Sequence, residues 1–148
     1  MIDPWIERAI IAGRYALEER LGERTWRARD SREDRLVVLR WEQDEALLLD
    51  RYARLERAHM LAGTVVAAPY DRGREADCWW MSREHVDGST LDRALRERWS
   101  GPSSGHALGD AWFAETLRSV AQSLARLHRA GIAHGALQGA CIKWLEIS

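Results

Sequence analysis

Hydrophobic and polar residues recur with two different periods along this chain, and the first region has the pattern of β-strands. The stretches Tyr15–Leu21 and Arg24–Asp30 flank a short turn at Gly22–Glu23, which predicts a hairpin. The continuous apolar run Leu36–Leu39 then predicts a buried third strand. The chain is therefore expected to begin as an antiparallel sheet.

An amphipathic helix is expected next, from Asp44 to Met60. Its apolar residues recur at spacings of three and four: Leu47, Leu48, Tyr52, Leu55 and Ala58. After the helix, Val65–Ala68 and Cys78–Met81 bracket the turn-forming segment Asp71–Arg74, which predicts a second hairpin. The first half of the chain should thus form a five-stranded antiparallel sheet with one packed helix.

The second half of the chain begins with a capping signal. Ser89 or Thr90 is expected to cap a helix over 90–99, with Asp92 in capping-box position to Ser89. A connector rich in glycine and serine follows over 100–109.

A longer helix is expected over 110–130, with Asp110 as its N-cap and Gly131 as its left-handed C-terminal stop. Its apolar stripe consists of Phe113, Leu117, Val120, Ala121, Leu124 and Leu127. A stripe at this spacing belongs to a packing surface and not to a ligand site.

Composition excludes several classes of function. The chain has 148 residues, which suits one domain or one lobe and part of another, and a net charge of -1, which argues against binding to nucleic acid. The two cysteines, Cys78 and Cys141, lack the spacing of a zinc site or a disulfide framework, so we expect a reducing cytoplasmic location. No stretch approaches about 18 continuous apolar residues, so no membrane span is expected.

The order of these elements resembles a bacterial serine/threonine protein kinase from its start to its catalytic loop. Four segments carry the resemblance: Arg14–Glu23, Arg27–Asp30, Glu84–Leu91 and Leu127–Gly135. No single segment is specific, but together they occur in the family's order over roughly residues 14 to 142.

The resemblance implies an α+β, kinase-like fold. Residues 1–13 would be an N-terminal flank, 14–86 the N-lobe, and 87–148 the hinge with a truncated helical C-lobe. A degenerate catalytic loop would lie at 132–141, and no D-F-G segment follows it.

The resemblance also places a vestigial nucleotide pocket at Gly22, Val38, Arg40, Glu84 and Val86. Gly22 alone remains of the glycine-rich loop, and the turn is about four residues too short to cover phosphates. Arg40 replaces the family's strand lysine, whose compact ammonium group a planar guanidinium does not match. Val38 adds volume where the family has alanine over the adenine.

Two more positions bear on this pocket. Asp50 is the best match to the helix glutamate that pairs with the strand lysine, so an Asp50–Arg40 ion pair is expected, with Arg51 or Glu56 as alternatives after a shift in register. Arg83 stands at the gatekeeper position, where a long charged side chain crowds the adenine site.

The loop expected to carry catalysis has lost its reactive groups. His134 remains as a residue that organises the backbone, but Ala136 replaces the aspartate that accepts or orients the substrate proton. Gln138 replaces the loop lysine, and Cys141 replaces the metal-binding asparagine, although Mg²⁺ prefers oxygen ligands. We therefore expect no catalytic residues, no bound ATP and no metal.

These substitutions predict a pseudokinase that serves as a protein-binding or regulatory module. Truncation would leave the stripe of helix 110–130 uncovered, so a protein partner or a second copy of the chain should cover it. Two alternatives stay open. One is a weak kinase that binds ATP through hinge backbone groups near Glu84 and Val86, with Arg40 in place of lysine; the other is a truncated, non-functional gene product.

The eight tryptophans offer candidate contact residues. Trp79 and Trp80 are adjacent on an expected strand, so their side chains should point to opposite faces of the sheet. The outward one could serve a protein interface or simply stack on a neighbouring arginine.

Overall fold

The protein is an α+β structure made of two compact units. The computed structural model describes residues 3–63, 66–90, 93, 96–97, 107–132 and 143–144. The first unit is Met1–His85 and the second is Val86–Ser148. Each unit is described by itself below.

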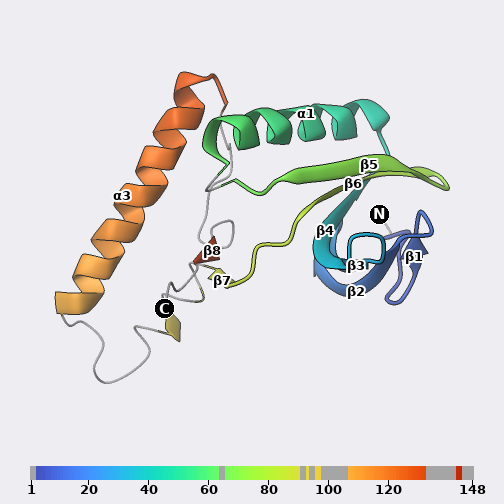
Figure 1. Cartoon of the computed structure of the whole chain (residues 1–148), viewed down its shortest axis with the longest axis horizontal. Helices are drawn as coiled ribbons and strands as arrows, with labels where there is room; N and C mark the ends of the chain where they lie inside the picture. The colour runs from blue at the N-terminus through green and yellow to red at the C-terminus, as the bar shows by residue number, and fades with distance from the viewer. Residues whose placement is uncertain are drawn as a thin grey trace. The chain divides into compact units, whose positions relative to one another are not determined.

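A curled, six-stranded antiparallel sheet forms most of the first unit (Figure 1). Its strands are β1 (Ile10–Ile11), β2 (Tyr15–Gly22), β3 (Thr25–Asp30), β4 (Arg35–Glu42), β5 (Pro69–Glu75) and β6 (Cys78–Glu84), in the order β1-β2-β3-β4-β6-β5. Side chains tie the β1–β2 end to the other edge. The amide of Ala12 donates to Glu75 Oε2 at 3.1 Å, and Arg14 Nη1 lies 3.2 Å from Asp71 Oδ2.

The prediction of five strands was wrong because β1 belongs to the segment taken as an N-terminal flank. Ile11 of β1 pairs with Tyr15 and is buried, and Trp5 from the same segment is buried beside it. Ala12 and Gly13, between β1 and β2, take positive φ angles, which let the chain turn back sharply on β2. A two-residue strand is too short to show a period in the sequence.

The first hairpin and the third strand were predicted correctly. β2 and β3 pair from Tyr15↔Asp30 to Gly22↔Thr25, with irregularities in register along β2. β4 pairs with β3 on one side and with β6 on the other. It lies in the interior of the sheet, which agrees with its continuous apolar run.

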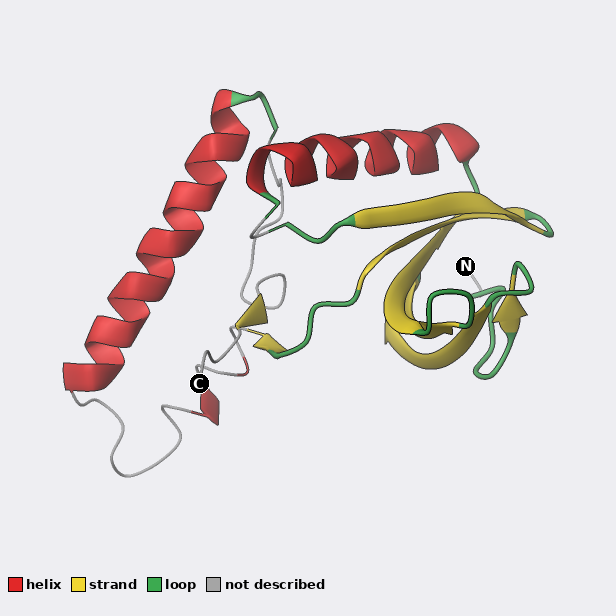
Figure 2. Cartoon of the chain, viewed as in Figure 1, coloured by secondary structure: helices red, strands yellow, loops and turns green. Residues whose placement is uncertain are grey.

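Helix α1 (Glu45–Ala62) was also predicted correctly and packs against β4, β5 and β6. Asp44 is its N-cap, because its Oδ1 accepts from the amides of Ala46 at 2.8 Å and Leu47 at 3.3 Å. The buried face of α1 uses Leu48 and Tyr52, which pack on Met81 of β6. Figure 2 shows the helix lying along the β5–β6 side of the sheet.

The second hairpin exists, but its first strand was misplaced. β5 spans Pro69–Glu75, so the segment Asp71–Arg74 is strand and the turn lies at Ala76 and Asp77. The strand needs glycine at position 73 because the indole of Trp80 packs against it, and a Cβ there would lie only 2.6 Å from the ring. Ala76 takes the positive φ of 50° that the turn requires.

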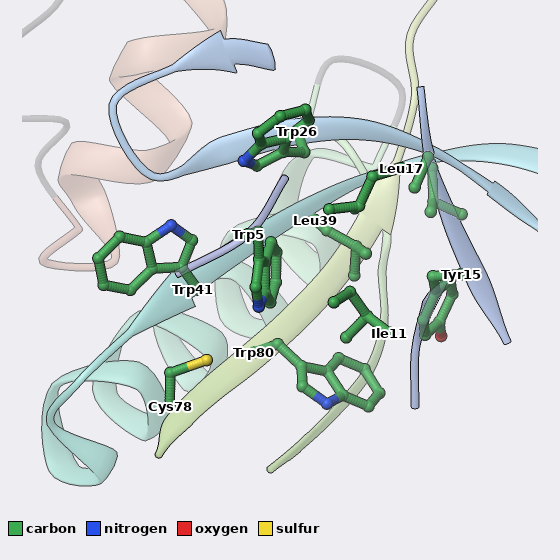
Figure 3. Packing of buried hydrophobic residues seen from close by; sticks show 11 residues of the cluster. Trp5, Ile11, Tyr15, Leu17, Trp26, Leu39, Trp41, Cys78 and Trp80 are labelled. Carbon is green, nitrogen blue, oxygen red and sulfur yellow. The ribbon is translucent and has the colours of Figure 1, made fainter. Parts of the chain in front are cut away.

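The core of the first unit lies on the face of the sheet opposite α1 and is rich in aromatic side chains (Figure 3). It contains Trp5, Ile11, Tyr15, Leu17, Trp26, Ala28, Val37, Leu39, Trp41, Cys78 and Trp80. A hydrogen bond also lies at the edge of this core. Trp26 Nε1 donates to Asp3 Oδ2 at 2.9 Å, so the N-terminal segment is anchored to β3.

The adjacent tryptophans of β6 point to opposite faces, as predicted. Trp80 enters the aromatic core and meets Tyr15 edge-on at 5.2 Å between ring centroids. Trp79 packs against the cluster under α1, and the guanidinium of Arg74 lies 5.7 Å from its ring. The arginine-stacking interpretation therefore describes Trp79 better than a role as an exposed contact.

The second unit contains β7 (Ser89–Thr90), α3 (Ala107–Arg129) and β8 (Lys143–Trp144). β7 and β8 pair antiparallel, so Thr90 lies in a strand and does not begin the helix predicted over 90–99. Within that range Arg93, Arg96 and Glu97 are helical. The lone lysine of the chain, Lys143, pairs with Thr90.

Helix α3 begins at Ala107, inside the predicted connector 100–109, so Asp110 is not its N-cap. Ala and Leu at 107 and 108 favour helix, and a single interior glycine costs only about 1 kcal/mol. The predicted C-terminal stop is confirmed. Gly131 has φ 75°, its amide donates to His128 O, and the amide of Ile132 donates to Leu127 O at 2.9 Å, which is a Schellman motif.

Helix α3 buries its stripe only in part. Phe113, Val120, Leu124 and Leu127 are half-buried, and Leu117 keeps 47% of its surface exposed. In the part of the chain that the structure describes, no helix is long and apolar enough to cross a bilayer.

Candidate functional site

The face of the sheet that α1 covers carries the two predicted pocket residues of β4. Residues paired across antiparallel strands share a face. Val38 pairs with Arg27 of β3 and with Arg83 of β6, and Arg40 pairs with Thr25 and Met81. Val38, Arg40 and Arg83 therefore lie together on the same face of β4 and β6.

A carboxylate shared by three arginines lies on this face at the end of β4. Glu42 is buried, with 1% of its side chain exposed. Its Oε1 accepts from Arg40 Nη2 at 2.9 Å and Nε at 3.1 Å, and it lies 3.2 Å from Arg51 Nε. Its Oε2 pairs with Arg24 Nη1, whose guanidinium also lies 5.2 Å from the ring of Trp41. We call Arg24, Arg40, Glu42 and Arg51 the Glu42 cluster.

The Glu42 cluster corrects the expected Asp50–Arg40 ion pair. Asp50 is exposed and pairs with Arg54 one helical turn along α1, at 3.1 Å. Glu42 binds Arg40 from the same strand, and Arg51 is the α1 residue that pairs with Glu42. Sequence reasoning missed Glu42 because it compared only the helix acids with Arg40.

The β2–β3 turn, expected to replace a phosphate lid, is a closed two-residue hairpin. Gly22 pairs with Thr25, and Arg20 donates to the carbonyls of Gly22 at 3.1 Å and Glu23 at 3.1 Å. Gly22 does not have a positive φ, and a Cβ there would meet only Thr25 Cβ at 3.9 Å. The turn is therefore stabilised locally, and glycine is not required at its one remaining position.

Arg83 occupies the position beside Val38 and Arg40. Its side chain is half-buried, and burial lowers its pKa, with the positive charge of Arg40 as the second cause. It forms no ion pair or side-chain hydrogen bond with any residue in the described part of the chain.

The two predicted hinge residues fall in different units, and only Glu84 has defined contacts. The Glu84 amide donates to Ala68 O at 2.8 Å, while Glu84 Oε2 accepts from the amide of Ala68 at 3.1 Å. Val86 is the first residue of the second unit and is half-buried. The Glu84 amide is thus already used within the sheet.

The predicted catalytic-loop positions His134, Ala136, Gln138 and Cys141 lie outside the described residues. Among the residues that the structure does describe, no group of three or more His, Cys, Asp or Glu side chains could hold a metal ion.

A pocket of about 350 Å³ opens elsewhere on the first unit, where sequence reasoning placed no site. Trp5, Ile11, Trp41 and Cys78 line it, and no residue of the predicted nucleotide pocket does. Burial raises the pKa of the Cys78 thiol, so this cysteine is not an activated nucleophile. The signal for this pocket lay in the apolar N-terminal residues, which had been assigned to a flank.

Neither a protein-family model nor a curated protein sequence matches this chain.

Proposed function

We propose that this chain is a protein-kinase-like domain without catalytic activity that acts as a regulatory, protein-binding module. The order of the elements along the chain supports this proposal. Hairpin β2–β3, strand β4, helix α1 and hairpin β5–β6 follow one another as the kinase resemblance requires, and Val38 and Arg40 lie on the face covered by α1.

One observation carries the proposal of inactivity: Arg40 is held by Glu42. In the resembled family the cation at this position must reach the phosphates of ATP. Here two of its nitrogens bond to a buried carboxylate that lies two residues along the same strand. A charge-assisted pair of this kind fixes the guanidinium in place. Arg40 is therefore a structural cation.

Further features agree with a lost phosphotransfer function. The β2–β3 turn closes on itself and leaves no loop to cover phosphates. In the sequence, Ala136 supplies no general base, a loss that costs about 10²–10⁴-fold in rate. A residual phosphotransfer activity would need other groups to cover the phosphates and to act as the general base.

The binding function follows from the apolar stripe of α3. Leu117 and Ala121 are exposed and the other stripe residues are only half-buried, so covering this face would remove apolar surface from water. We propose that a protein partner or a second copy of the chain covers it. We also propose a cytoplasmic location, from the spacing of the two cysteines.

Nucleotide binding tests the proposal. ATP at about 1 mM, with a Kd below about 100 μM, would raise the free energy of unfolding by more than about 1 kcal/mol. We expect no stabilisation that depends on Mg²⁺, measured by thermal unfolding with ATP in the presence of Mg²⁺ and of EDTA. An active protein kinase run in parallel gives the response of a working site.

The variant Arg40→Met makes this test specific. We expect the responses of Arg40→Met and of the control Arg54→Met to ATP and Mg²⁺ to equal that of the unmodified chain, because Arg54 is exposed on α1. Stabilisation that requires Mg²⁺ and disappears only in Arg40→Met would identify Arg40 as a phosphate ligand and overturn the proposal.

A further inference from the structure

The pocket of about 350 Å³ in the first unit lies between the two edge strands of the sheet, β1 and β5. Its walls come from the N-terminal segment, the end of β4 and the turn between β5 and β6. At its edge the Ala12 amide donates to Glu75 Oε2 at 3.1 Å and so joins the two sides. The volume falls within the range of about 300–1,000 Å³ that small-molecule sites have.

The pocket has an apolar interior. Trp5, Ile11 and Trp41 line it, and each is at most 5% exposed. Half-buried Ala9 and exposed Ile10 add apolar surface nearer to solvent. An apolar group that entered would therefore leave water, which favours binding. The tryptophan rings are too well covered to surround a cation with open aromatic faces, as an aromatic cage does.

The rim of the pocket is acidic. Glu75 is half-buried and Asp77 is exposed, and both line the pocket from the turn between β5 and β6. Neither forms an ion pair with a described residue, and none of the described residues that line the pocket is basic. The adjacent cation, Arg74, lies over the ring of Trp79 on the other face of the sheet.

One of the two carboxylates is held in a fixed position. Glu75 Oε2 accepts from the Ala12 amide, whereas its Oε1 has no donor among the described residues. The Cys78 thiol in the same pocket senses this negative charge. Burial is the main cause of its raised pKa, and the charges of Glu75 and Asp77 raise it further. The rim therefore has acceptors and a negative charge that attract a cation.

We propose that this pocket binds a small primary amine with an apolar body. The ammonium group lies between Glu75 and Asp77, and the apolar body lies against Ala9 and Ile10. A primary ammonium has three donors for the two carboxylates, whereas a quaternary ammonium has none and would need open aromatic faces. The pocket shares no residue with the Glu42 cluster, so the proposal does not depend on the function proposed above.

Isothermal titration calorimetry at pH 7 tests the site with three probes. Pentylamine is protonated at this pH, as a lysine side chain is. The second probe, 1-pentanol, has the same chain without the charge, and ammonium chloride has the charge without the chain. We expect pentylamine to bind at least tenfold more tightly than either. Equal affinities for pentylamine and 1-pentanol, or no binding of pentylamine, would overturn the proposal.

A double variant assigns the binding to this pocket. Glu75→Gln combined with Asp77→Asn removes both charges, while glutamine keeps an oxygen that can accept from the Ala12 amide. We expect the affinity for pentylamine to fall at least tenfold and that for 1-pentanol to stay unchanged. The control Asp50→Asn removes a charge from the exposed surface of α1 and should leave both affinities unchanged.

A second variant keeps the test valid if the double variant unfolds. Ile10 lines the pocket and is 62% exposed, so Ile10→Lys should fold normally, which thermal unfolding checks. Its tethered ammonium group would occupy the acidic rim and lower the affinity for pentylamine at least tenfold. Undiminished pentylamine binding in a folded Ile10→Lys variant would place the amine elsewhere and overturn the proposal.

Discussion

At the scale of single residues, the type of a residue does not reveal which neighbour it contacts in the fold. Arg40 has the charge of a phosphate ligand, but Glu42 places it in a structural pair. Gly73 is typical of a turn, but the ring of Trp80 requires it inside a strand. Both outcomes depend on a contact with another residue: Glu42 is close to Arg40 in the sequence, whereas Trp80 reaches Gly73 only through the pairing of β5 with β6.

Gly73→Ala should destabilise the first unit. The new Cβ would lie 2.6 Å from Trp80 Cζ2 and 2.9 Å from Cε2, so the buried indole must move. Such overpacking typically costs about 1–3 kcal/mol, which urea unfolding would measure. The control Gly22→Ala meets only Thr25 Cβ at 3.9 Å and should change stability by less than about 0.5 kcal/mol. Equal effects of the two substitutions would refute this account of Gly73.

Asp30 should give the protein part of its sensitivity to acid. Its side chain is fully buried, and hydrogen bonds from Arg14, at 2.7 Å to each carboxylate oxygen, lower its pKa. Because the folded pKa is below the unfolded value, the stabilisation is present above pH ~3.9 and is lost as the pH falls through the folded pKa.

Asp30→Asn tests this linkage. The variant should be less stable at pH 7, because it leaves Arg14 without its main partner, and its stability should fall less steeply below pH ~4. The difference in slope can reach about 1.4 kcal/mol per pH unit. Urea unfolding at several pH values measures both effects, and parallel profiles for the two proteins would contradict the assignment.

At the scale of elements, prediction succeeded where a period was long enough to read. Helix α1 has a capping aspartate and five apolar residues at helical spacing, and hairpin β2–β3 has a turn between two clear stretches. β1 has only two residues, and β5 begins at a proline and carries mostly charged residues. Their pairing depends on tertiary contacts such as Trp5 and Trp80, which no local pattern contains.

The same limit applies to the candidate site. Val38 and Arg40 could be predicted from the sequence to share a strand, and Arg83 was a candidate residue on another strand. The register of β4 and β6 places all three on one face of the sheet. Glu42 and the link through Arg51 could not be predicted, because they depend on which turn of α1 faces the end of β4. A carboxylate two residues after Arg40 was the one signal available.

Glu42→Gln should weaken the attachment of α1 to the sheet. The change leaves three arginines without their shared, buried negative charge. Removing one partner from a buried ion pair typically costs about 3–5 kcal/mol. Urea unfolding measures the loss, with Asp50→Asn as a control on the exposed surface of α1, expected to cost less than about 0.5 kcal/mol. A cost for Glu42→Gln as small as the control's would show that the cluster is not a structural centre.

At the scale of the whole molecule, we propose that a kinase-like frame is kept while its catalytic groups are replaced. The first unit stabilises itself through an aromatic core and the Glu42 cluster, neither of which needs a ligand. The second unit presents α3 with its apolar stripe only partly covered. We therefore expect the folded protein to associate with a partner or with a second copy of the chain through this stripe.

Leu117→Glu tests this association. Leu117 is 47% exposed, so the substitution should leave thermal stability nearly unchanged while it adds charge to the apolar stripe. We expect sedimentation velocity to show a discrete dimer for the unmodified chain and a monomer for Leu117→Glu. A dimer that persists in the variant would show that α3 is not the interface.

Phosphoryl transfer is the most direct measurement of the central claim. Purified protein would be incubated with γ-labelled ATP, Mg²⁺ and a mixture of serine- and threonine-containing peptides, beside its Arg40→Ala variant. We predict no labelled product above background from either protein, because Glu42 holds Arg40 and position 136 is alanine. Labelled peptide made by the unmodified chain and lost in Arg40→Ala would contradict it.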